Sequence, residues 1–112
     1  MNNDLEIATM GGSADQVLCI LKSLANRDRL SILCHLSQVE LNVSEIEHIT
    51  GIQQPTLSQQ LMILRKSNVV STRRDGKQIY YTIKDQALIV LLNTLCQLYG
   101  EQALQVHLDN AS

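Results

Sequence analysis

The hydrophobic periodicity of this chain changes near Asn68, and that change limits the folds that the sequence can adopt. Before Asn68, aliphatic residues recur at the spacing of amphipathic helices. From 69 to 83 the residues are β-branched and aromatic, and the dipeptide Asp75-Gly76 interrupts them as in a tight hairpin. After Asp85 a helical stripe of leucines returns. The sequence therefore predicts a mainly α protein with one β-hairpin.

Capping residues and glycine divide the helical part into segments. Ser13, Asn26 and Asp85 can cap the first turn of a helix. Gly51 accepts the left-handed conformation that ends a helix, so 51–53 reads as a three-residue turn. Pro55 fits the first turn of the next helix, where a missing N–H is harmless. We expect helices over about 13–25, 27–37, 43–50, 54–67 and 86–99, and strands over 69–74 and 78–83.

The short helix, the glycine turn and the next helix form a helix-turn-helix pattern, and a basic hairpin follows it directly. Either element alone is weak evidence, but together and in this order they predict a winged helix-turn-helix. The length of 112 residues fits one domain. We expect a flexible N-terminal arm over 1–12, one domain over 13–107 and a C-terminal tail over 108–112.

The fourth predicted helix has a polar, uncharged face that suits the major groove of DNA. Gln side chains can bond adenine edges, and Ser or Thr can bond bases or phosphates. Arg73, Arg74 and Lys77 flank the hairpin tip and can reach phosphates or the minor groove. Solvated polar residues would give the same pattern on an isolated helix. The residues expected to bind double-stranded DNA are Gln54, Thr56, Ser58, Gln59, Arg65, Arg73, Arg74 and Lys77.

The charge distribution supports this expectation although the whole chain has a net charge of −2. The span 54–84 contains six basic residues and one acid, a net charge of +5, and the rest contains three basic residues and ten acids, a net charge of −7. A local basic surface on an acidic protein is what phosphate binding requires. A solvated charged face is the alternative.

Two runs resemble the ArsR family of winged-helix repressors. The first is LANRDRLSIL over 24–33, and the second combines 54–64 with the hairpin over 69–81. The resemblance covers roughly 15–100. It implies a homodimer that contacts its partner through the first and last helices, binds an inverted-repeat operator and represses until an inducer weakens DNA binding. Two leucine-rich stripes are expected at that interface: Val17 to Leu24 on the first helix and Leu88 to Tyr99, which includes Leu92 and Leu95, on the last.

The cysteines bear on the inducer. The chain resembles the family branch that contains the haemolysin regulator, the biofilm-growth-associated repressor and the rhizobial nodulation regulator. The ending Leu98-Tyr99-Gly100 resembles the nodulation regulator, which is not known as a thiol sensor. Two of these sense oxidants or reactive sulfur through two cysteines, of which Cys34 matches the first. The second falls at Gly100, whereas this chain has Cys96 one helical turn earlier. Cys34 and Cys96 are thus candidates either for redox sensing or for packing, and Cys19 is expected to pack.

Other functions have less support. The family's CxC metal motif is replaced by residues 41–45, LNVSE, and the three histidines are scattered, so we expect no metal and no cofactor. No phosphate loop, nucleophile–base pair or paired carboxylates indicate an enzyme. No apolar stretch spans a membrane and the first twelve residues hold two acids and no base, so we expect a cytoplasmic protein. A regulator without thiol sensing, controlled by a protein or not induced, and a protein-interaction module are the alternatives.

Overall fold

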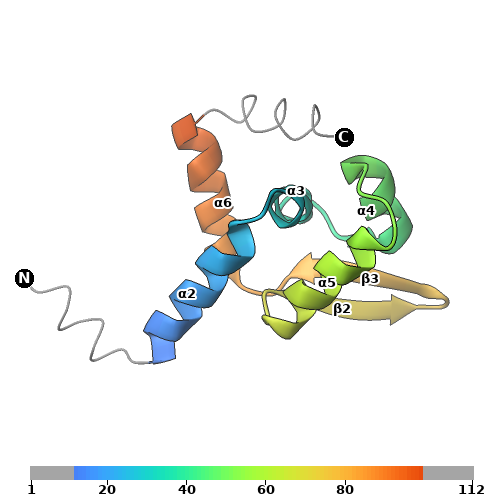
Figure 1. Ribbon diagram of the computed structural model, residues 1–112, viewed down its shortest axis with the longest axis horizontal. Helices are drawn as coiled ribbons and strands as arrows, with labels where there is room; N and C mark the ends of the chain where they lie inside the picture. Colours follow the sequence, from blue (N-terminus) through green and yellow to red (C-terminus); the bar gives the residue numbers. More distant parts are fainter. Residues whose placement is uncertain (1–11, 100–112) are drawn as a thin grey trace, which may run out of the picture.

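A computed structural model describes residues 12–99 and contains five helices and three strands in that range. The described chain is mainly helical, with the short strand β1 between the second and third helices and the β2–β3 hairpin between the fourth and fifth (Figure 1). The elements are α2 (Gly12–Leu24), α3 (Arg27–Leu36), β1 (Leu41–Asn42), α4 (Val43–Thr50), α5 (Thr56–Lys66), β2 (Val70–Asp75), β3 (Gln78–Ile83) and α6 (Gln86–Tyr99). This confirms a mainly α fold with a β-hairpin. The predicted arm and tail lie outside the described residues, except for Gly12, which belongs to α2.

Side-chain caps define several helix starts as the sequence predicted. The Asn26 side chain accepts a hydrogen bond from the backbone N–H of Arg29 at 3.1 Å. Asn42 and Glu45 form a reciprocal capping box at the start of α4. Asp85 accepts from the backbone N–H of Ala87. Helix α2 begins at Gly12, one residue before the predicted Ser13 cap, a difference within the usual scatter of helix ends.

The turn between α4 and α5 is longer than predicted. Gly51 ends α4 with φ 74°, as expected, but α5 begins at Thr56 and its N-cap is Pro55. The connection therefore runs over 51–55 rather than 51–53. Proline is tolerated at the N-cap because it has no N–H to leave unpaired. The N–H of Ser58, in the first turn of α5, donates to the side chain of Gln54 and not to the Gln54 backbone carbonyl.

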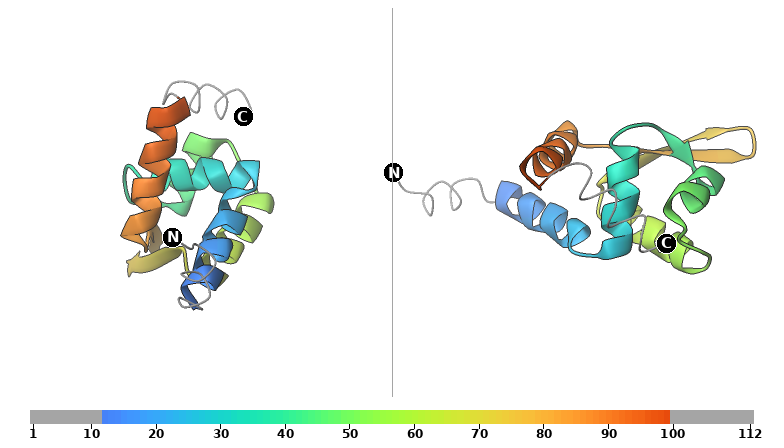
Figure 2. Two further views of the ribbon diagram at one scale, coloured as in Figure 1. Left: turned by 90° about the vertical axis from the view of Figure 1, so that its left-hand side faces the viewer. Right: turned by 90° about the horizontal axis from the view of Figure 1, so that it is seen from above.

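The sheet is antiparallel with the order β1-β3-β2, and its β2–β3 hairpin is the wing. Asp75 pairs with Gln78, so Gly76 and Lys77 form a two-residue turn in which Gly76 has φ 64°. A positive φ at this position is what glycine accommodates without strain. Strand β2 starts at Val70, one residue later than predicted. The wing projects away from the end of the molecule where α2 and α6 lie (Figure 2).

The core is built around α3, which packs against α2, α4, α5 and β3. Ile32 and Leu33 on α3 are fully buried, as are Leu57 and Leu64 on α5. Leu88 and Leu92 of α6 join this core. Leu88 and Leu92 are only 1% and 2% exposed within a single chain, so their assignment to the dimer stripe is wrong. Periodicity marks α6 as apolar but does not tell which of its two apolar sides faces its own core.

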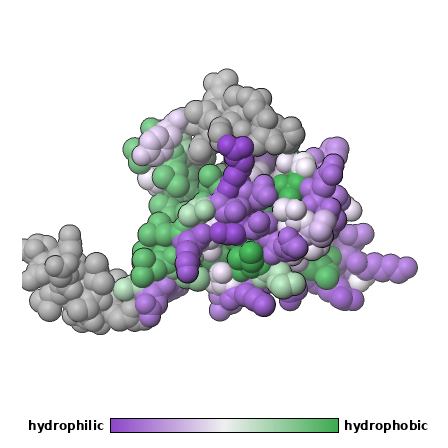
Figure 3. All heavy atoms as spheres, in the orientation of Figure 1, coloured by the Kyte–Doolittle hydropathy of each residue, from purple (hydrophilic) through white to green (hydrophobic). Residues whose placement is uncertain are grey.

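The other side of α6 and the outer side of α2 remain apolar and exposed. Leu18 of α2 is 62% exposed and Leu98 of α6 is 70% exposed. Figure 3 shows the hydrophobic surface that these two helices make at one end of the molecule, while the rest of that view is largely hydrophilic. This α2/α6 surface is made of the exposed side chains of Val17, Leu18, Leu21, Val90, Leu98 and Tyr99.

Candidate nucleic-acid interface

Helix α5 presents a polar face because its apolar residues repeat on one side only. Leu57, Leu61 and Leu64 are buried against the core, as the sequence predicted. The neighbouring residues in the first turns of α5, Thr56, Ser58 and Gln59, are exposed. The side chain of Gln59 makes no hydrogen bond within the described range 12–99, so its amide is available to a base edge.

Gln54 lies outside the helix and caps it. Its Oε1 accepts hydrogen bonds from the backbone N–H of Ser58 at 3.0 Å and from the Ser58 hydroxyl at 2.7 Å. The side-chain oxygen of Gln54 therefore satisfies one of the free backbone N–H groups at the start of α5. In this conformation the Oε1 of Gln54 is engaged with α5, and only its amide nitrogen is left to donate.

Gln60 joins the interface helix to the rest of the chain. Its Oε1 accepts a hydrogen bond of 3.0 Å from Arg29 of α3. Arg29 also donates to the backbone carbonyls of Ser23 and Lys22, at 3.1 Å each, near the end of α2. One guanidinium thus binds the last turn of α2 and the middle of α5. Gln60 is half-buried, whereas the neighbouring Gln59 is exposed.

The three basic residues predicted for the wing differ in their surroundings. Arg73 forms a two-bond ion pair with Glu40, at 2.8 Å and 2.7 Å, and its guanidinium carbon lies 4.5 Å from the centre of the Tyr80 ring. This hydrogen bond lowers the pKa of Glu40. Arg74 and Lys77 are exposed and have no ion-pair partner among residues 12–99. The wing therefore has two free cations and one that is held by the chain itself.

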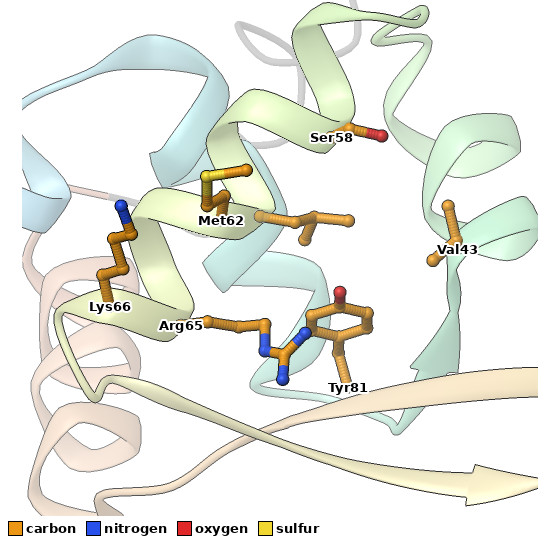
Figure 4. A pocket seen from close by; sticks show the side chains of 7 residues that line it. Val43, Ser58, Met62, Arg65, Lys66 and Tyr81 are labelled. Carbon is orange, nitrogen blue, oxygen red and sulfur yellow. The ribbon is translucent and has the colours of Figure 1, made fainter.

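A pocket of about 470 Å³ lies where α5 faces β3 and the start of α4 (Figure 4). Arg65 extends toward Tyr81, whereas Lys66 points away from it. Neither cation has an ion-pair partner within the described part of the chain. The pocket is lined by Val43, Ser58, Leu61, Met62, Arg65, Lys66 and Tyr81, and none of these is acidic.

The two candidate redox cysteines, Cys34 and Cys96, lie on α3 and α6. Burial raises the pKa of Cys34 to about 11, and the nearby charge of Cys96 adds to the increase. Cys96 is half-buried and both thiols are free. The Cys34 thiol is therefore protonated and poorly nucleophilic at neutral pH. Cys19 is half-buried, and its Sγ lies 3.5 Å from the Ser67 carbonyl, to which it donates.

Among residues 12–99, no three His, Cys, Asp or Glu side chains gather closely enough to hold a metal ion. His35 bonds through Nδ1 to the Ser31 carbonyl at 2.8 Å, His48 is exposed, and His107 lies outside the described residues. No helix in the described range has the length and apolar character needed to cross a membrane.

The structure brings most of the predicted DNA-binding residues onto α5 and the wing. It also identifies three residues that the sequence analysis did not assign. Glu40 holds Arg73 across a sequence separation of 33 residues, which no local pattern reveals. Gln60 bonds to Arg29. The third, Tyr81, could have been found from strand alternation, which places it on the side of β3 opposite to Tyr80.

Comparisons with known proteins agree with this architecture. Residues 26–72 match the family model described as bacterial regulatory protein, arsR family. The chain is 42% identical over 92 residues to the biofilm growth-associated repressor of Xylella fastidiosa, which covers 82% of this chain and 81% of that protein. The crystal structure of the transcriptional repressor BigR from Xylella fastidiosa superimposes with a TM-score of 0.75 at 41% identity, covering 82% of this chain and 94% of the other.

A second similar structure is described as a homodimer. It is the solution structure of a homodimeric winged helix-turn-helix DNA-binding domain from Mycobacterium bovis, a possible ArsR-family regulator. It superimposes with a TM-score of 0.68 at 35% identity, covering 93% of this chain and 92% of that one.

Proposed function

Because the chain belongs to the ArsR family of bacterial regulatory proteins, we propose that it represses transcription by binding an inverted-repeat operator as a homodimer. Its family and relatives are DNA-binding transcriptional regulators, so the chain is a winged-helix DNA-binding regulator and not an enzyme. The proposal concerns how this chain binds DNA, how it pairs and what signal releases it.

The observation that carries the DNA-binding proposal is the exposed polar start of α5 beside unpaired cations on the wing. Thr56, Ser58 and Gln59 read base edges in the major groove, because they are exposed at the N-terminal end of the helix. Arg74 and Lys77 bind phosphates or the minor groove, because no acid in the described chain pairs with them. Arg73 is proposed at the same surface, where it must either keep Glu40 or exchange it for phosphate.

Hydroxyl-radical footprinting on the DNA upstream of the protein's own coding sequence tests this proposal. We expect two protected half-sites in an inverted repeat, with centres about one helical turn or a multiple apart. Gln59→Ala should lose the protection on that site while keeping weak binding to random duplex. Protection spread evenly along the fragment would contradict sequence-specific binding.

The α2/α6 surface supports the homodimer. An apolar surface of this extent on a small domain marks an interaction site, and two copies related by a two-fold axis would cover it. The Mycobacterium bovis domain, which has the same fold, is homodimeric by its description. Sedimentation of the wild-type protein at micromolar concentration should give a dimer, and a monomer would contradict the proposal.

The thiols of Cys34 on α3 and Cys96 on α6 are the candidates for a thiol signal, since the charge of Cys96 contributes to the raised pKa of Cys34. A disulfide oxidant or an organic persulfide would take two electrons and two protons from these thiols as they join. The bond would tie α6, at the proposed dimer interface, to α3, which supports the helix-turn-helix. Because Cys34 is buried and protonated, the reagent would first react at the half-buried Cys96. A coupling of about 1–3 kcal/mol would lower operator affinity roughly 5- to 150-fold.

The burial of Cys34 favours a second candidate, a regulator without thiol sensing that a protein controls or that is not induced. In that case both thiols only pack, since a protonated buried thiol reacts slowly. Operator binding before and after treatment with an organic persulfide separates the two. Release that Cys34→Ser and Cys96→Ser each abolish supports sensing, and unchanged affinity supports the second candidate.

A further inference from the structure

The hydroxyl of Tyr81 is unusual because its residue is buried while its oxygen has no hydrogen-bond partner among residues 12–99. Tyr81 is only 6% exposed. Its Oη makes no hydrogen bond to any of residues 12–99, yet no buried polar atom in this range lacks a partner, so the oxygen must reach solvent. Figure 4 shows the hydroxyl directed into the pocket between α5 and β3. A buried tyrosine normally has a hydrogen-bond partner for its hydroxyl, and within residues 12–99 this oxygen is free to bond water or a ligand.

The chemistry of the pocket indicates the nature of that partner. Arg65 points toward Tyr81 from α5 and has no anion within the described residues. With no acid in the lining, Arg65 and the Tyr81 hydroxyl are both donors directed into one space, which favours an anion with several acceptor oxygens. Arginine and tyrosine are common donors to the phosphates of DNA.

The apolar wall and the position of the pocket favour a phosphate within a DNA strand over a free anion. Val43, Leu61 and Met62 complete the lining and suit the C–H edge of a deoxyribose, which a free phosphate lacks. Ser58 belongs both to the pocket and to the polar face of α5 proposed to read bases. A DNA backbone that passes Ser58 would therefore belong to the same DNA strand whose bases α5 contacts.

We propose that this pocket binds one phosphate of the operator backbone, through the Tyr81 hydroxyl and the Arg65 guanidinium. This inference rests on the proposed DNA-binding function and adds Tyr81 to it. Tyr81 is opposite Leu41 of β1 and Thr72 of β2, at the middle of the sheet. A phosphate held from both β3 and α5 would fix the wing relative to the recognition helix and thereby set the register of α5 in the groove.

Tyr81→Phe tests this inference because it removes the hydroxyl and keeps the buried ring. We expect affinity to fall about 10- to 100-fold on operator and random duplex alike, the effect of one hydrogen bond to a charged phosphate that carries no sequence information. The slope of log affinity against log salt should not change, since no charge is lost. Arg65→Gln should also weaken both duplexes and should reduce the slope by about 0.9.

Tyr80→Phe is the matched control, since Tyr80 is the neighbouring tyrosine on the opposite side of β3. It should bind DNA as the wild type does, and thermal unfolding should show that both Phe variants fold. Wild-type affinity in Tyr81→Phe, or an equal loss in Tyr80→Phe, would overturn the inference. A wild-type protein that binds no duplex would instead refute the proposed function.

Titration of the DNA-free protein with inorganic phosphate, at constant ionic strength, separates the two sources of an anion. We expect no saturable binding in the low millimolar range, because the apolar wall and the second contacts of a strand are then missing. Saturable binding that Tyr81→Phe abolishes would assign the pocket to a free anion and overturn the DNA inference.

Discussion

The hydrogen bond between Arg29 and Gln60 connects the two ends of the proposed mechanism, and its removal makes a quantitative prediction. Arg29 binds the last turn of α2, which carries part of the proposed dimer surface, and also binds α5. Gln60→Met removes the acceptor with little change in volume. A hydrogen bond to a charged donor contributes about 1.5–3 kcal/mol when buried, and Arg29 reaches some water, so we expect a loss of about 1 kcal/mol.

Arg29→Met should cost more, about 2–3 kcal/mol. It loses the bond to Gln60 and also both bonds to the carbonyls of Lys22 and Ser23, which end α2. In a domain of this size each kcal/mol corresponds to roughly 4–8 °C in the midpoint of thermal unfolding. Gln59→Met is the matched control, because that neighbouring side chain is exposed, and its stability should equal the wild-type value.

A double-mutant cycle between Arg29 and Gln60 isolates the pair. Urea unfolding at one fixed protein concentration keeps the contribution of dimerisation constant across the four proteins. We expect a coupling free energy of about 1 kcal/mol, together with weaker operator binding by Gln60→Met. A coupling free energy near zero would refute the reasoning, because it would show that α2 and α5 are not linked through this contact.

The remaining predictions concern the interface, the DNA contacts and the thiols. Leu21→Asp should give a folded monomer, because Leu21 lies on the exposed apolar surface, whereas Leu92→Asp should unfold the domain; sedimentation and circular dichroism distinguish the two. Arg74→Gln should weaken binding to all duplexes and reduce the salt slope by about 0.9, while Gln59→Ala should cost about 1–3 kcal/mol on the operator only; fluorescence anisotropy at several salt concentrations measures both. Cys34 should react with iodoacetamide about 100-fold more slowly at pH 7 than a thiol of pKa 9.0, because its raised pKa of about 11 leaves less thiolate, and the rate should rise with pH up to that value; a fast reaction at pH 7 would contradict the burial of this thiol.

The elements of the fold could be predicted because their signals are local. Asn26 and Asp85 cap helices as their positions in the sequence indicated, and Gly76 forms the hairpin turn beside Asp75. The start of α5 was placed two residues too early because a proline is as acceptable at the N-cap as in the first turn. Such boundaries depend on which side chain satisfies the first N–H groups.

The surroundings of the site residues could not be predicted in the same way. Arg73 and Glu40 are far apart in sequence, and the sheet brings them together by pairing β1 with β3 and β3 with β2. Leu92 repeats with the exposed apolar residues of α6 but faces the core, because periodicity locates an apolar stripe and not the element that covers it. Tyr81 is a candidate for phosphate binding because its hydroxyl is directed into the pocket between α5 and β3, which no sequence pattern reveals.

Binding of the reduced wild-type protein to its own upstream DNA, compared with a scrambled duplex of equal length, tests the central claim most directly. Fluorescence anisotropy at one stated salt concentration should give an affinity at least about 1,000-fold higher for the upstream DNA. Sedimentation of the saturated complex should give two chains per duplex. Equal affinity for the two duplexes, or one chain per duplex, would contradict a dimeric, sequence-specific repressor.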